Sequence, residues 1–183
     1  MTTQPYDPRA IANLMLDEAD RVGRPITNLA LQKLLYFVHS LFLIEHKRPL
    51  ISGYFEAWRL GPVHPAVYSA FKQWGDKPIQ MKACKRNVLT GEKSEIPLPS
   101  AQEVLTLIAH VMRSYGKLTP GRLVDLAHAK GAPWDTIVAQ GSTGVAVGLR
   151  IPDELIIQRF KHHKISVGVI PRNGEPGENT PFA

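Results

Sequence analysis

The residues that could bind a metal are the seven histidines, whose ring nitrogens are common zinc ligands. None of them forms a His-x-x-x-His pair. His162 and His163 are adjacent, so on a helix their side chains would diverge by about 100°. Only His39 and His46, two helical turns apart with Glu45 beside them, could share one face. Surface or packing roles account better for each histidine, and we therefore predict neither a metal nor a cofactor.

Nucleophilic and phosphate-binding chemistry is no better supported. The sequence lacks the Gly-x-Ser-x-Gly elbow of serine hydrolases, and its single cysteine, Cys84, has no histidine near it in sequence. The glycine-spaced stretch 141–148 lacks both the lysine of a Walker loop and the spacing of a dinucleotide fingerprint. A flexible connection explains that stretch. The sequence predicts a binding protein and not an enzyme.

The composition predicts a cytoplasmic globular protein. The 183 residues are 44% hydrophobic and 21% charged, which allows a real core. The N-terminus shows no signal-peptide pattern, and the longest apolar run, 34–44, is shorter than the roughly 20 residues that span a bilayer. The formal charge of +6 would suit an acidic protein or nucleic acid, but the basic residues are scattered, apart from small clusters at 82–86 and 159–164.

One stretch combines polar and aromatic residues in an unusual way. Gln32 and Lys33 begin a helix that is otherwise nearly all apolar, where a buried amide or ammonium needs partners. Downstream, Gly61-Pro62 forms a turn that would fix where two elements meet. Trp58 and Tyr68 flank this turn as large anchors with polar tips. The candidate partner-binding residues are Gln32, Lys33, Tyr36, Trp58, Arg59 and Tyr68. Each of them could instead serve packing or hydrogen bonding within the core.

The order of these motifs resembles the Panacea domain of SocA-like antitoxins. Members of that family typically show Leu-x-Leu-Gln-Lys-Leu-Leu-Tyr, then Ala-Trp-x-x-Gly-Pro-Val, then Val-Tyr…Phe-Lys. The corresponding residues here are 29–36, 57–63 and 67–72, and Pro133-Trp134 is similar to the C-terminal part of the domain. The resemblance covers roughly residues 8–160 and marks Gly61, Pro62 and Trp134 as structural motif residues.

The resemblance implies an antitoxin that neutralises a cognate toxin by direct protein–protein binding. It would either block the toxin's active surface or deliver the toxin to a cytoplasmic protease. Family members pair with unrelated toxins, so the toxin's identity does not carry over. The alternative is a basic protein that binds or cleaves nucleic acid through Lys and Arg together with His39, His64 or Tyr36. Nucleic acid is the less expected partner, and no membrane contact is predicted.

The elements that must position these residues are mostly helical. Periodic apolar residues predict helices at 8–22, from Thr27 or Asn28 to 46, at 65–75, from Ser100 with Glu103 as a capping box to 116, at 119–131 and at 152–160. Residues 53–58 favour strand or loop, residues 76–99 a β-hairpin or an irregular excursion, and residues 164–170 a strand. We predict a mainly α, compact multi-helix single domain over 8–165, with a short β-hairpin or small strand elements. Residues 171–183 are expected to form a mobile C-terminal tail.

Overall fold

A computed structural model describes residues 5–141 and 149–160 of the chain. This part holds seven α-helices and five short strands in two small sheets, which confirms the predicted mainly α fold class. The strand predicted at 164–170 and the tail predicted at 171–183 lie outside the described residues. The domain boundary at residue 165 lies outside them too and stays a prediction.

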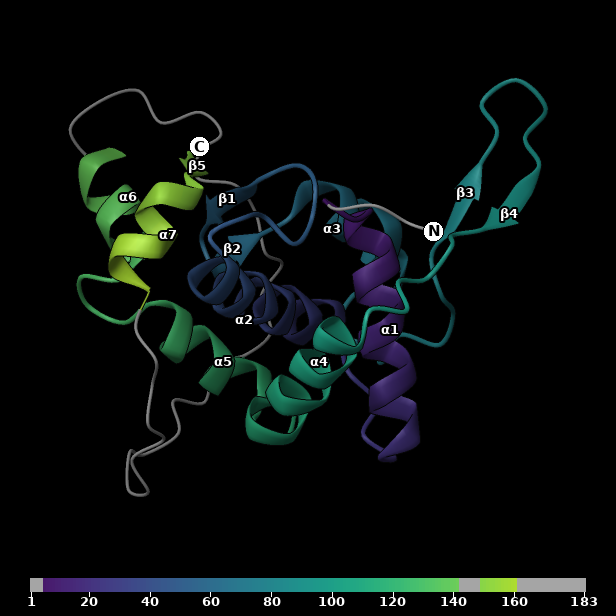
Figure 1. Cartoon of the computed structure of the whole chain (residues 1–183), viewed down its shortest axis with the longest axis horizontal. Helices are drawn as coiled ribbons and strands as arrows, with labels where there is room; N and C mark the ends of the chain where they lie inside the picture. The colour runs from purple at the N-terminus through teal and green to yellow at the C-terminus, as the bar shows by residue number, and fades with distance from the viewer. Residues whose placement is uncertain (1–4, 142–148, 161–183) are drawn as a thin grey trace.

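Helix α2 (Asn28–His46) is the centre of the fold. Figure 1 shows it between the small sheet and helices α4 (Gln102–Tyr115) and α5 (Pro120–Ala127). Helix α1 (Pro8–Arg21) lies at one end, and α7 (Asp153–Arg159) also packs on α2. Because α2 has neighbours on several sides, it is buried nearly all round, as its apolar composition predicts.

Local signals place the first two helices correctly. Asp7 caps α1 by accepting a hydrogen bond from the backbone N–H of Arg9, and proline occupies the first turn. Thr27 caps α2 by accepting from the N–H of Ala30. Lys47 ends α2 in the left-handed conformation, with φ of 55°. These boundaries need no information from distant parts of the chain.

The start of α4 differs from the predicted capping box. Ala101 is the N-cap residue, and no side chain caps the helix. The backbone is still extended at Ala101, with ψ of 123°, and Pro99 before it is buried. The helix therefore begins at Gln102, and Ser100 lies one residue too early to cap it.

A three-stranded antiparallel sheet covers one side of α2. Its order is β2-β1-β5, formed by β2 (Gly61–Val63), β1 (Phe55–Trp58) and β5 (Arg150–Ile151). Trp58 pairs with Gly61, so β1 and β2 are joined by a tight turn at Arg59 and Leu60. Gly61 and Pro62, predicted as the turn itself, are instead the first two residues of β2. Helix α3 (Pro65–Phe71) follows at once and continues as a short 3-10 turn at Lys72–Trp74.

The C-terminal half departs most from prediction. Helix α5 ends at Ala127 and not near Gly131, and it is followed by a helix that the sequence did not predict, α6 (Pro133–Gly141). The Asp135 carboxylate accepts a hydrogen bond from the N–H of Gly131 and thereby fixes the α5–α6 connection. Helix α6 is short and carries few buried residues, so it left no clear period in the sequence.

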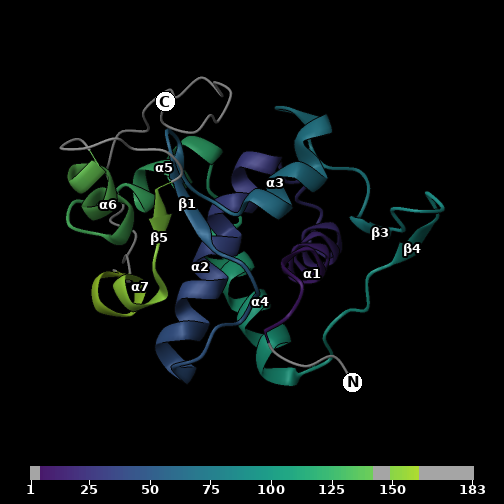
Figure 2. The ribbon, with the colours of Figure 1, turned by 90° about the horizontal axis from the view of Figure 1, so that it is seen from above.

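Residues 84–95 form the predicted hairpin, with β3 (Cys84–Arg86) paired to β4 (Lys93–Glu95). Val88 and Leu89 lie in the loop that connects the two strands. Figures 1 and 2 both show this hairpin extending away from the helices, beside α1. We call residues 84–95 the finger.

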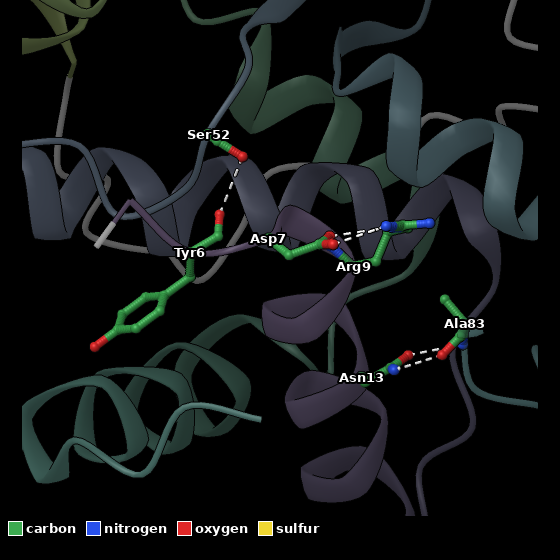
Figure 3. Close-up of polar contacts among 6 residues, drawn as sticks. All are labelled: Tyr6, Asp7, Arg9, Asn13, Ser52 and Ala83. Carbon is green, nitrogen blue, oxygen red and sulfur yellow. Dashed lines mark hydrogen bonds and ion pairs between the residues drawn. The ribbon is translucent and has the colours of Figure 1, made fainter. Parts of the chain in front are cut away.

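A buried asparagine holds the base of the finger against α1. The Asn13 side chain donates to the carbonyl of Ala83 (2.9 Å) and accepts from the N–H of Ala83 (2.8 Å), as Figure 3 shows. Asn13 is almost fully buried. This pair of bonds satisfies both backbone groups of one residue and fixes where the chain leaves the body.

Replacing Asn13 by alanine should therefore lower the free energy of unfolding by about 1–3 kcal/mol, because two backbone groups lose their partner. Urea denaturation measures this loss. Asn87→Ala, at the exposed end of the finger, is the matched control and should leave global stability within about 0.5 kcal/mol. Equal effects of the two variants would contradict a role for Asn13 as the anchor.

Candidate partner-binding surface

The polar residues of α2 bind the backbone of the segment that follows β1. The Gln32 side chain donates to the side-chain oxygen Oδ1 of Asn28 (3.0 Å) and accepts from the backbone N–H of His64 (2.9 Å). His64 is the N-cap residue of α3, which has no side-chain cap of its own. Gln32 therefore satisfies a backbone group at the start of α3 from inside the core.

Lys33 makes the second such contact. Its Nζ donates to the carbonyl of Pro62 at 2.9 Å, and the side chain is fully buried. Burial among apolar atoms lowers the pKa of Lys33 well below its ordinary value. A buried ammonium is costly, so this environment favours the neutral amine, which still donates the hydrogen bond to Pro62.

Gly61 is the residue that lets Lys33 reach this carbonyl. Its φ is +98°, a conformation that L residues rarely adopt. A Cβ at this position would lie 3.0 Å from the Lys33 Cε and 3.4 Å from the Ala127 Cβ. The Gly61-Pro62 motif and Lys33 are therefore two halves of one packing arrangement between α2, β2 and α5.

Aromatic side chains surround the outer side of the same turn. The Trp58 ring packs edge-on against Tyr68, with ring centroids 4.7 Å apart, and its Nε1 donates to the Glu56 carboxylate. Trp134 of α6 donates from its Nε1 to the carbonyl of Trp58 at 2.9 Å. It also stacks on His128, with ring centroids 3.6 Å apart. Residues from β1, α3, α5 and α6 thus meet at one turn.

His128 is uncharged in this position. Burial and, to a smaller extent, the nearby Lys33 together lower its pKa to about 4, although Asp135 opposes the shift. A neutral imidazole at neutral pH stacks on Trp134 without bringing a charge into the cluster. Packing is therefore the role that its geometry supports.

Exposure divides the six candidate residues. Gln32, Lys33 and Tyr36 are in the interior, and Trp58 is only 8% exposed. Tyr36 packs edge-on against Phe55 and Phe160, with ring centroids 5.2 and 5.8 Å away, and burial raises its pKa. Arg59 is exposed, and Tyr68 is half-buried. We call Arg59, Tyr68 and the half-buried Trp134 the turn surface; the buried candidates lie behind it.

A second polar site lies at the start of α1. An open depression of about 410 Å³ is lined by Asp7, Pro8, Arg9, Ser52, Gly53, His64 and Ala66. Arg9 donates two side-chain hydrogen bonds to the Asp7 carboxylate, so the two charges balance each other (Figure 3). Burial opposes the shift, but hydrogen bonds and charge from Arg9 outweigh it and lower the pKa of Asp7. The His64 Nε2 donates a hydrogen bond to the Ser52 carbonyl oxygen.

The metal hypothesis can be compared directly with this geometry. His39 pairs with Asp153 at 3.2 Å and lies against Phe55, whereas His46 packs on Phe42. Within residues 5–141 and 149–160, no three His, Cys, Asp or Glu side chains are grouped so that they could hold an ion. None of the helices in the same ranges is long and apolar enough to cross a membrane.

Sequence reasoning missed Asn13, His128 as the stacking partner of Trp134, and the exposed Val88 and Leu89. The local signal for Asn13 was a polar residue on the apolar face of an amphipathic helix. Val88 and Leu89 lie within residues 76–99, for which the sequence predicts a hairpin or an irregular excursion, and no local signal indicates their exposure. Their exposure depends on how the hairpin leaves the body.

The fold and the turn surface together are those of a mainly helical domain, built around one central helix whose buried polar groups fix a β-turn. A protein-family model described as "Antitoxin SocA-like, Panacea domain" matches residues 31–135. Antitoxin SocA of Caulobacter vibrioides (strain NA1000 / CB15N) is 44% identical over 178 residues, which cover 97% of this chain and 95% of the relative. The chain belongs to the SocA-like Panacea antitoxin family. No solved structure is significantly similar to it.

Proposed function

We propose that this chain is an antitoxin that neutralises a cognate toxin by binding it directly in the cytoplasm. The observation that carries the proposal is its 44% identity to Antitoxin SocA over 97% of the chain. A match of that length includes the turn, the central helix and the aromatic cluster together. The function therefore comes from the family, and the structure supplies candidates for the contact.

The turn surface is the proposed contact for the toxin. Arg59 is exposed at the β1–β2 turn, and Tyr68 and Trp134 are half-buried beside it. Arg, Tyr and Trp are the residue types that most often dominate binding energy at protein interfaces. Gln32, Lys33 and Trp58 would act indirectly in this proposal, because their contacts with residues 56–64 hold the turn in one shape.

Two routes to neutralisation share this binding step. The antitoxin either covers the active surface of the toxin or hands the toxin to a cytoplasmic protease. The routes differ in one measurable quantity, the half-life of the toxin in cells that contain the antitoxin. A shortened half-life indicates delivery, and an unchanged half-life with restored growth indicates blocking.

Co-expression with the product of the adjacent gene tests the proposal. That product is expected to arrest growth alone, and this chain should restore growth and co-purify with it. Arg59→Glu should weaken the pair at least about tenfold, because it reverses a charge at the proposed contact. Lys47→Glu, an exposed charge reversal at the end of α2, is the matched control. If the adjacent product is harmless and never associates, the antitoxin proposal is wrong.

A further inference from the structure

The finger carries the most exposed apolar residues of the described chain. Val88 is 96% exposed and Leu89 is 95% exposed, and they are adjacent at the end of the hairpin. Every residue from Lys85 to Glu95 is exposed, so the finger adds nothing to the core. An isolated two-stranded ribbon is marginally stable in water. Packing among residues 5–141 and 149–160 therefore does not explain why two aliphatic residues lie at the end of the hairpin.

The loop that holds Val88 and Leu89 is ordered by its own hydrogen bonds. The Asn87 side-chain oxygen accepts from the backbone N–H of Leu89 (2.9 Å) and of Thr90 (3.3 Å). The loop is closed by backbone bonds from Gly91 to Asn87 and from Asn87 to Glu92, both 2.8 Å. A loop that already has one shape loses less entropy when a partner binds it.

The base of the finger is fixed to the body. Asn13 holds Ala83 through two hydrogen bonds, and Lys82 forms an ion pair with Asp17. Ile79 before the finger and Ile96 after it are both buried. The structure therefore presents Val88 and Leu89 at a defined distance from α1, on an arm that is anchored at both ends.

The charges near Val88 and Leu89 help to distinguish among the possible binding partners of the finger. Lys85 and Arg86 precede the apolar end, and Glu92, Lys93 and Glu95 follow it. The chain carries a formal charge of +6, so a second copy would bring like charge against a basic arm. A backbone of phosphates would leave Val88 and Leu89 without an apolar surface to contact, whereas an apolar pocket with acidic residues beside it suits both the aliphatic end and the neighbouring Lys85 and Arg86.

We infer that the finger is a second contact for the cognate toxin, in addition to the turn surface. Val88 and Leu89 insert into an apolar pocket of the toxin, and Lys85 and Arg86 meet acidic residues at the rim of that pocket. This inference rests on the proposed antitoxin function and adds the place and the chemistry of binding. It assigns the finger a role that the core of the fold does not require.

The test uses the full-length chain and the purified product of the adjacent gene. The double variant V88S/L89S should raise the Kd at least about 100-fold, because it removes two fully exposed aliphatic anchors. Its unfolding transition should match that of the parent chain, since neither side chain is packed. Val22→Ser removes a partly exposed apolar residue at the end of α1 and should leave the Kd unchanged. Lys85→Glu with Arg86→Glu should slow association and reduce its salt dependence.

Each other outcome has a distinct meaning. If the parent chain binds and rescues, and V88S/L89S does so equally well, the finger inference is wrong while the antitoxin function stands. If the parent chain neither binds nor rescues, the proposed function fails and the finger inference fails with it. A change from dimer to monomer in V88S/L89S would assign the finger to self-association. Loss of salt-sensitive retention of a DNA duplex, with toxin binding unchanged, would assign it to nucleic acid. Either result overturns the inference.

Discussion

Gly61→Ala is expected to lower the free energy of unfolding by about 2–4 kcal/mol, which combines backbone strain at positive φ with a close contact. The φ of +98° suits glycine only, and the new Cβ would lie 3.0 Å from the Cε and 3.3 Å from the Nζ of Lys33. The buried amine could withdraw only by losing its bond to the Pro62 carbonyl. Chemical denaturation of the variant and the parent chain measures the loss.

The control for this prediction is Gly23→Ala. Like Gly61, Gly23 has a positive φ, +65°, but no atom lies within 4 Å of the Cβ that alanine would add at Gly23. It should therefore cost only the backbone strain, about 1–2 kcal/mol. If the two variants lose the same stability, the contact with Lys33 contributes nothing. The Gly61 variant should also bind the toxin more weakly, because the turn that presents Arg59 would shift.

Lys33→Met is expected to remove a pH dependence from the stability of the protein. In the unfolded chain a lysine holds its proton up to a pH of about 10.4. In the folded protein burial lowers the pKa of Lys33, so unfolding takes up one proton between the two values. Rising pH therefore stabilises the folded protein, by about 1.4 kcal/mol per pH unit while one proton is taken up. This pH-dependent stabilisation is lost as the pH falls toward the pKa that Lys33 has in the folded protein.

Unfolding free energies measured in urea from about pH 7 to 10 should thus rise less steeply for Lys33→Met than for the parent chain, by up to about 1.4 kcal/mol per unit. Methionine keeps most of the volume, so the comparison does not create a large cavity. Lys72→Met, at an exposed lysine that follows α3, is the matched control and should keep the slope of the parent chain. Identical slopes for all three proteins would show that Lys33 is not forced to release its proton on folding.

These two predictions describe one structural unit. Gln32 and Lys33 of α2 and Gly61-Pro62 of β2 belong to separate motifs of the sequence, and the structure joins them through hydrogen bonds between the two α2 side chains and backbone groups of Pro62 and His64. The aromatic residues Trp58 and Trp134 close the outside of the same unit. The unit fixes the shape of a turn, and Arg59 at that turn is the part that a partner can reach.

Local chemistry in the sequence determined the helical class, the caps of α1 and α2, a chain reversal close to Gly61 and the need of Gln32 and Lys33 for buried partners. Those features depend on residues that are close together in the sequence, so they can be predicted without knowing the rest of the fold. Only the tertiary structure decided which partners are found, because Lys33 meets Pro62 across 29 residues, Asn13 meets Ala83 across 70 and Trp134 meets Trp58 across 76. It also decided exposure: it buried Tyr36 and left Val88 and Leu89 in solvent. The burial of a side chain depends on which residues pack around it. In short elements such as α6 and the finger, the spacing of apolar residues along the chain does not predict this burial.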